Sequence, residues 1–165
     1  MARQRGLTSA EIEMARKAFA GQITYGRVKI SDGPGNNFAA QIAFAKGNPA
    51  ITLGSTIYFK RDYCPDFCAT GKDRKSFMHE MAHVWQYQRF GRADFLLRYG
   101  QEFLAVGGKP NDMYVYRRGV TKFSEAMLEA QASMIADYSE ALWTGNADQK
   151  ARLAKNLEGS GVYGL

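Results

Sequence analysis

Apolar side chains recur at helical spacing in five segments of this chain. At the first, Thr8-Ser9-Ala10-Glu11 resembles a capping box, and an apolar face continues through Ile12 and Phe19, which predicts a helix over residues 8–20. The same spacing predicts helices over residues 73–90, 93–106 and 124–143, and a weaker helix over residues 148–157. Gly91 is expected to end the second helix, because glycine is common just beyond a helix C-terminus.

Short runs rich in β-branched and aromatic residues predict extended segments between the helices. These runs cover residues 25–30, 39–45, 50–59 and 114–116, with turn residues at 31–37 and at Asn48-Pro49. The pattern predicts an α+β domain, mostly helical with a small sheet. A chain of 165 residues is long enough for one well-packed domain. We expect a single domain over residues 1–165, with a core over about 7–143 and a helical tail over 144–165.

Composition and charge narrow the class of protein. The chain is 45% hydrophobic and 13% aromatic, and no apolar run reaches the roughly 20 residues of a membrane span. Its formal net charge is +6, but the basic residues are scattered, which favours a solvated surface over binding of nucleic acid or an anionic envelope. The N-terminal segment lacks the apolar core of a signal peptide, so we expect no export by the general secretory route.

The two histidines of the chain, His79 and His83, belong to one H-E-x-x-H motif. On a helix, residues four apart share a face, so the two imidazoles can converge on one ion. Two neutral imidazoles suit a zinc ion that keeps a bound water, and Glu80 between them can act on that water as a general base. The motif therefore predicts a zinc site with His79 and His83 as ligands and Glu80 as the catalytic residue.

The alternative is that these histidines are a surface pair or satisfied core residues. The flanking residues Phe77, Met78, Val84 and Trp85 predict a largely buried helix. Burial of two imidazoles and a carboxylate among such side chains is costly unless they are paired or coordinated. A metal ion bound by the two imidazoles would offset that cost, so the metal site is favoured.

A third zinc ligand must come from a different element, and the helix predicted over residues 124–143 offers Glu125 and Glu129. In an arrangement like that of thermolysin, Glu125 would bind zinc and Glu129 would orient a histidine. Glu129 could equally bind zinc itself. The spacing alone leaves both choices open.

Beyond the motif, several segments carry a closer resemblance. The specific ones are Phe77–Gln88, with Val-Trp-Gln after the second histidine, and Leu128–Tyr138, which begins with Leu-Glu-Ala-Gln-Ala. Weaker ones are Leu7–Ile12, Ile57–Phe59 and Tyr114–Tyr116. Over most of residues 7–140 the chain resembles the vgr-related zinc metallopeptidases, a zincin family that includes metallopeptidase domains fused to VgrG spike proteins of type VI secretion systems.

This resemblance implies a zincin-like metallopeptidase fold, zinc as the cofactor and Glu129 as the third ligand, although Ala130 stands where the family pattern has Gln. It also implies an antibacterial effector toxin, delivered by a secretion apparatus and acting in the periplasm of a target bacterium. A peptide or protein would then be the substrate, and a secretion-apparatus component and an immunity protein would be partners. No nucleic acid is expected as a partner.

Two other functions are compatible with the motif. One is hydrolysis of peptide crosslinks in peptidoglycan, which uses the same zinc and water chemistry. The other is a non-catalytic, zinc-stabilised binding module, against which Glu80 argues because a structural zinc site needs no general base.

With no third histidine, an oxyanion donor would have to come from Tyr114, Tyr116, Tyr138 or Arg117. Residues 57–59 are either an edge strand that pairs with an extended peptide or an ordinary core strand.

The two cysteines of the chain, Cys64 and Cys68, allow three interpretations. They could form a local disulfide in an oxidising compartment or remain thiols in a reducing one. Metal binding by the pair is the least favoured, because the histidine motif already supplies a metal site.

Overall fold

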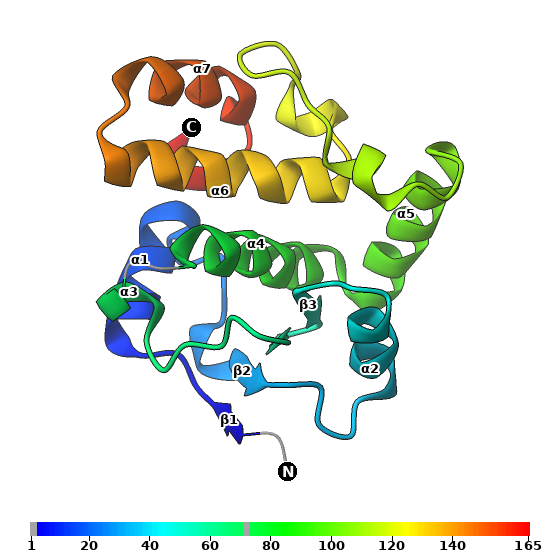
Figure 1. The fold of residues 1–165 in the computed structure, drawn as a ribbon. Helices are drawn as coiled ribbons and strands as arrows, with labels where there is room; N and C mark the ends of the chain where they lie inside the picture. Colours follow the sequence, from blue (N-terminus) through cyan, green and yellow to red (C-terminus); the bar gives the residue numbers. More distant parts are fainter. Residues whose placement is uncertain (1–2, 71–72) are drawn as a thin grey trace.

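The fold is an α+β arrangement in which a small sheet, a long central helix and a second long helix lie in successive layers (Figure 1). The computed structural model of the chain describes residues 3–70 and 73–165. The strands are β1 (Arg3–Arg5), β2 (Lys29–Asp32), β3 (Ala50–Leu53) and β4 (Thr56–Phe59). The α-helices are α1 (Ser9–Phe19), α2 (Phe38–Ala45), α3 (Phe67–Thr70), α4 (Arg74–Phe90), α5 (Arg92–Ala105), α6 (Leu128–Thr144) and α7 (Ala147–Leu157). Short 3₁₀ helices are η1 (Tyr25–Arg27), η2 (Pro110–Tyr114), η3 (Phe123–Glu125) and η4 (Val162–Gly164).

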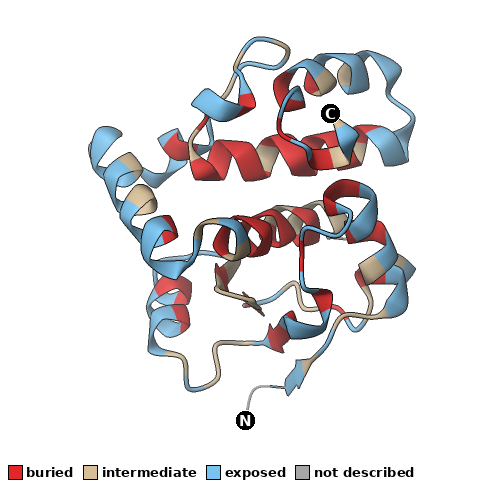
Figure 2. Cartoon of the chain, turned by 180° about the vertical axis from the view of Figure 1, so that it is seen from behind, coloured by how far each residue is buried: buried red, intermediate tan, exposed pale blue. Residues whose placement is uncertain are grey.

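Helix α4 lies at the centre of the molecule. It contacts β3 and β4 on one side and α6 on the other, and the residues of α4 and α6 that face each other are largely buried (Figure 2). Gly91 ends α4 with a φ of +83° and directly precedes α5. The positive φ, which side chains with a Cβ rarely adopt, explains why glycine occupies this sharp junction. The helix predicted over 73–90 and its end at Gly91 are therefore confirmed.

The sheet has the strand order β1-β2-β4-β3. Strands β2 and β4 are parallel, whereas β1 pairs with β2 and β3 pairs with β4 in antiparallel fashion. Since β4 is hydrogen-bonded on both sides, Ile57–Phe59 lies in an inner strand. Of the two alternatives for this segment, the core strand is confirmed and the edge strand is wrong. The edge next to α4 is β3 instead, and among the described residues no strand pairs with its outer side.

Other helices agree with the apolar pattern. The capping box at the start of α1 is present, because Thr8 Oγ1 accepts from Glu11 N and the Glu11 carboxylate accepts from Thr8 N. Helices α5 and α7 match the segments predicted over 93–106 and 148–157 within one residue at each start. Helix α6 begins at Leu128, whereas residues 123–125 form η3, so the start predicted at 124 is wrong.

The extended segments are predicted less well. Residues 39–45 form α2 rather than a strand, with Asn37 as a cap whose Oδ1 accepts from Ala40 N at 3.0 Å. A short apolar run of this kind fits either structure by periodicity alone. Residues 50–59 are two strands joined at Gly54-Ser55 rather than one. Residues 25–27 form η1, and 114–116 contain the end of η2 and no strand.

The main core joins α1, α4, α6 and the sheet to the C-terminal segment. Its largest fully buried side chains include Phe19, Trp85 and Met134. Leu153, Leu157 and Val162, from α7 and the residues after it, have no exposed area and belong to the same cluster. Residues 144–165 thus contribute directly to the packing around α6. Within the described residues, no helix has both the length and the apolar character needed to cross a membrane.

Cys64 and Cys68 are not joined by a disulfide. The thiol of Cys64 donates to the carbonyl of Asp66 at 3.1 Å, and Cys68 Sγ lies 3.9 Å from the sulfur of Met14. Burial raises the pKa of the Cys68 thiol, with a further contribution from Asp66. The structure thus corresponds to the thiol alternative, and neither cysteine belongs to the metal-ligand cluster described below.

Candidate metal centre

Two ring nitrogens from α4 and one carboxylate oxygen from α6 meet at one point. His79 and His83 lie one turn apart on α4, and Glu129 lies in the first turn of α6. Nε2 of each histidine is 3.0 Å from Glu129 Oε2, and the two Nε2 atoms are 3.2 Å apart. The structure brings together the two histidines of the motif and the glutamate that the family resemblance implies as the third ligand. Their binding of zinc stays a prediction.

The spacing of these three atoms fits a tetrahedral zinc site. Zinc holds nitrogen and oxygen ligands at about 2.0–2.1 Å, so tetrahedral ligands lie about 3.3 Å from one another. The observed separations of 3.0, 3.0 and 3.2 Å are close to this value. Two imidazoles and one carboxylate are also a ligand set of catalytic zinc sites, which keep a fourth position for water. The residues present therefore fit the ion.

The charges around the cluster reinforce this view. Burial alone would lower the pKa of His83, but the adjacent Glu129 carboxylate outweighs it and raises that pKa to about 9. Burial alone would raise the pKa of Glu129, yet the two histidines hold it well below its usual range. A buried carboxylate that stays ionised attracts a cation, either a proton on His83 or a metal ion in the same place.

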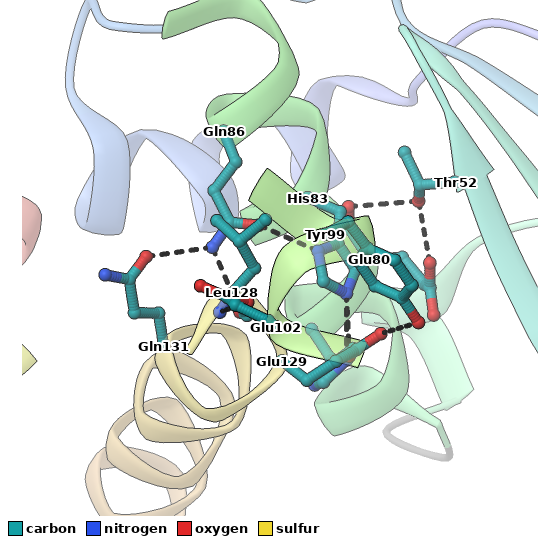
Figure 3. Close-up of polar contacts among 10 residues, drawn as sticks. Thr52, Glu80, His83, Gln86, Tyr99, Glu102, Leu128, Glu129 and Gln131 are labelled. Carbon is teal, nitrogen blue, oxygen red and sulfur yellow. Dashed lines mark hydrogen bonds and ion pairs between the residues drawn. The ribbon is translucent and has the colours of Figure 1, made fainter. Parts of the chain in front are cut away.

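The second oxygen of Glu129 has its own partner. Tyr99, from α5, donates its hydroxyl hydrogen to Glu129 Oε1 at 3.2 Å (Figure 3). Burial, followed by the nearby Glu129 carboxylate, raises the pKa of Tyr99, so the phenol stays neutral and remains a donor. This bond directs Oε1 away from the histidines and leaves Oε2 as the oxygen that faces them.

Glu80 is held by the edge strand of the sheet. Thr52, in β3, donates its hydroxyl hydrogen to Glu80 Oε2 at 2.7 Å, and both residues are buried (Figure 3). Glu80 is not part of the three-residue ligand cluster but lines the same pocket as its members. This position separates a carboxylate that can accept a proton from the three residues that can bind a metal.

A cleft opens over the cluster. A pocket of about 170 Å³ includes the four site residues, with Leu53 from β3 and Phe95, Leu96 and Tyr99 from α5 on its walls. An adjoining, more open hollow of about 510 Å³ extends past His79 and Glu80 to Lys75 and Asp137. Both are bordered by β3 and by Tyr114. The site is therefore accessible along a path that follows the free edge of the sheet.

Of the four oxyanion candidates, the cleft includes Tyr114 alone among the described residues. Its ring stacks on that of His79, with centroids 5.8 Å apart and an interplanar angle of 19°. Burial raises the pKa of Tyr114, so its hydroxyl remains a neutral donor. Tyr116 instead donates to Asp137 Oδ2, and the ring of Tyr138 packs on Tyr163. Arg117 is exposed and belongs to neither pocket.

Glu125 is not part of the cluster. It lies in η3, its side chain is 66% exposed, and its carboxylate faces Lys122 Nζ at 3.7 Å. The arrangement like that of thermolysin, with Glu125 as the zinc ligand, is wrong for this structure. The 3₁₀ turn before α6 points Glu125 outward, whereas Glu129 follows on the buried face of the helix.

Sequence reasoning missed three residues with direct contacts to the site: Thr52, Tyr99 and Gln86. Thr52 and Tyr99 are 28 and 30 residues away from the groups that they contact, so no local pattern reveals them. Gln86 did leave a signal, since it follows His83 by three positions and therefore shares its face of α4. Its Oε1 lies 2.8 Å from His83 Nδ1.

Comparisons with known proteins place this geometry in context. Residues 10–91 match the family described as the eCIS core domain. The matched segment runs from α1 to the end of α4, so it includes His79, Glu80 and His83 and excludes Glu129. No curated protein sequence matches the chain.

Among solved structures, the chain is similar to the effector domain of Pseudomonas aeruginosa VgrG2b. The TM-score is 0.67 at 23% sequence identity, and the alignment covers 94% of this chain and 82% of that domain. The expected relation to VgrG-associated effector domains is thus confirmed at the level of the fold. The chain is similar in sequence to the eCIS core domain over residues 10–91, and it has the fold of a VgrG effector domain.

Proposed function

We propose that this protein is a zinc-dependent metallopeptidase with a zincin-like fold. The observation that carries the proposal is the triangle of His79 Nε2, His83 Nε2 and Glu129 Oε2, with Glu80 beside it in an open cleft. A site that only stabilised the fold would be closed by a fourth protein ligand and would have no use for a buried carboxylate next to it.

In this proposal, each residue of the centre has a separate role. His79, His83 and Glu129 would hold the zinc ion, which would act as a Lewis acid and lower the pKa of the water bound to it. Glu80, oriented by Thr52, accepts a proton from the attacking water as the carbon–oxygen bond forms. Glu80 then passes that proton to the amine nitrogen as the carbon–nitrogen bond breaks. Tyr114, at the mouth of the cleft, is the candidate donor to the oxyanion.

The edge strand β3 suits an extended peptide substrate. Among residues 3–70 and 73–165 no strand pairs with its outer side, and Ala50, Thr52 and Leu53 border the cleft. A peptide that adds to this edge would pass over Glu80 and the ligand cluster. The apolar side chains of Leu53, Phe95 and Leu96 would then receive an apolar side chain of the substrate.

Purified protein loaded with zinc is expected to hydrolyse an unstructured protein at internal peptide bonds. A chelator should stop the cleavage, and added zinc should restore it, because the activity depends on the ion. New amino termini in the products, identified by mass spectrometry, measure the reaction. Cleavage that continues in protein shown to be free of metal would contradict the proposal.

The proposed biological role is that of an antibacterial effector in the periplasm of a target bacterium, delivered by a type VI secretion apparatus. It is supported by the similarity to the eCIS core domain and to the VgrG2b effector domain. The substrate there would be a protein or the peptide part of peptidoglycan, both of which have the scissile amide that the site requires.

Expression in bacteria with and without an added export signal tests this location. We expect growth inhibition only when the chain is exported, and only when Glu80 is present, because the substrate and the catalytic base are both needed. Colony counts after induction measure the effect. Inhibition by unexported protein would reject the periplasm, and inhibition by exported Glu80→Gln protein would reject peptidase activity as its cause.

A further inference from the structure

A buried chain of two glutamine amides connects His83 to the backbone before α6. Gln86 Oε1 lies 2.8 Å from His83 Nδ1, and Gln86 Nε2 donates to the carbonyl of Leu128 at 3.0 Å and to Gln131 Oε1 at 3.1 Å. Gln131 Nε2 donates in turn to the carbonyl of Phe123 at 2.9 Å. Figure 3 shows Gln86 between His83, Leu128 and Gln131. The two glutamines are 0% and 3% exposed, so solvent does not satisfy these groups.

The direction of every hydrogen bond in this chain follows from its two backbone ends. A carbonyl oxygen only accepts, so Gln131 must present its NH₂ group to Phe123 and its oxygen to Gln86. Gln86 therefore presents its NH₂ group to Gln131 and Leu128, and its oxygen to the ring of His83. Reversal of either amide would place an oxygen against a buried carbonyl and leave donors unpaired, which is costly.

This direction determines where His83 carries its hydrogen. An amide oxygen accepts, so His83 Nδ1 must be the donor, and in the neutral ring Nε2 then carries the lone pair. That lone pair belongs to the atom that lies 3.0 Å from Glu129 Oε2 and 3.2 Å from His79 Nε2. The amide chain thus selects the tautomer that can bind a metal at the cluster.

Gln86 also links the two helices that supply the ligands. Its oxygen contacts His83 on α4, and its nitrogen contacts the carbonyl of Leu128, the residue directly before Glu129 at the start of α6. One buried side chain therefore sets both the orientation of a ring ligand and the position of the helix turn that carries the carboxylate ligand.

We propose that Gln86 is a positioning residue of the metal centre: it keeps the ring hydrogen of His83 on Nδ1, so that Nε2 is the nitrogen left to bind a metal, and it holds the helix turn that carries Glu129. This proposal rests on the proposed zinc site. Gln131 acts one step further out, because it orients the Gln86 amide without contact to either ligand. Gln86 lies outside the cleft and has no part in proton transfer to the substrate.

Gln86→Met and Gln131→Met form a matched pair of tests. Each variant removes one buried amide and keeps a side chain of similar volume, so each loses buried hydrogen bonds and some stability. Gln86→Met is expected to weaken zinc binding by about 10–100-fold, the usual cost of losing the partner of a metal-binding histidine. Gln131→Met should weaken it by less than about tenfold, because the carbonyl of Leu128 still orients Gln86.

Competition with a chromophoric zinc chelator measures the dissociation constant, and thermal melts of the metal-free proteins measure stability. The proposal requires that zinc affinity separate the two variants even where their melting temperatures fall together. Equal loss of zinc affinity in both variants would assign the effect to stability and overturn the proposal. Unchanged affinity in Gln86→Met would overturn it as well.

NMR of the ring nitrogens tests the position of the hydrogen on His83 directly. Since the chain has two histidines, ¹⁵N-histidine labelling yields four ring nitrogens, which a His79→Ala protein helps to assign. In zinc-loaded wild-type protein, the His83 Nδ1 proton should be shifted downfield and exchange slowly. Gln131→Met should retain this signal, and in Gln86→Met it should move upfield and exchange faster. A signal unchanged in Gln86→Met would overturn the proposal.

Zinc binding by the wild-type protein separates failure of the proposed function from failure of the role of Gln86. Wild-type protein that binds no zinc would overturn both the proposed function and the role of Gln86. Wild-type protein that binds zinc tightly, together with a Gln86→Met protein of the same affinity and the same Nδ1 signal, would overturn the positioning role alone.

Discussion

Glu80→Gln protein is expected to retain one zinc ion per chain and to lose about 10²–10⁴-fold in peptide hydrolysis, the usual contribution of a general base. Glutamine preserves the shape of the side chain and can still contact Thr52, but its amide cannot accept a proton at neutral pH. Zinc content by elemental analysis and kcat on an unstructured protein measure the two effects. Turnover like that of the wild type would reject Glu80 as the base.

Thr52→Val tests the same base indirectly, and we expect a smaller loss of activity than in Glu80→Gln. Valine keeps the shape of the β3 side chain and removes the hydroxyl that donates to Glu80 Oε2 at 2.7 Å. A hydrogen bond to a charged group contributes roughly 1.5–3 kcal/mol, so we expect a loss of about tenfold or more in kcat with zinc binding unchanged. An effect on zinc affinity instead would show that Thr52 acts on the ligand cluster rather than through Glu80.

Glu129→Gln protein is expected to lose zinc affinity by more than the roughly 10–100-fold that the loss of a partner around a metal ligand costs. The variant removes the negative charge that the two histidines face at 3.0 Å. A neutral amide oxygen at the same place attracts a divalent cation far less strongly. Competition with a chelator measures the dissociation constant.

Glu125→Gln is the matched control for this prediction. It removes the same charge four residues earlier, from a side chain that is 66% exposed and paired with Lys122. We expect its zinc affinity to equal that of the wild type, because exposed pairs of this kind contribute little. Strong loss of zinc in Glu125→Gln, with full binding in Glu129→Gln, would transfer the ligand role to Glu125 and contradict the geometry described above.

The part of the site on α4 could be predicted from the sequence because its residues lie within five positions of one another. His79, Glu80 and His83 share one helix, and the period of an α-helix alone places the two imidazoles on one face. The burial of that helix was visible in Phe77, Met78, Val84 and Trp85, which are all buried in the structure. The end of α4 at Gly91 and the capping box of α1 are equally local, and both are present.

The errors lie where short segments depend on their neighbours. Residues 39–45 are apolar enough for a strand, yet the Asn37 cap and the packing of Phe44 and Ala40 against Tyr58 make them a helix. The order of the strands is also non-local, because β2 and β4 are joined by residues 33–55 and pair in parallel. Consequently β3, and not the segment 57–59, became the edge beside the cleft.

From the sequence alone, the two histidines, the carboxylate between them and the helix that presents them could be identified, since 3.6 residues per turn is enough to align the imidazoles. The spacing did not decide whether Glu125 or Glu129 is the third zinc ligand. Glu129 reaches the histidines because α6 packs on α4 and η3 turns Glu125 outward. The same packing supplied Thr52, Tyr99 and the amide chain of Gln86 and Gln131. Apart from the local contact between Gln86 and His83, the contacts of Thr52, Tyr99 and Glu129 and the bond between Gln86 and Gln131 join residues 28–50 positions apart, and such distances close only when the core forms.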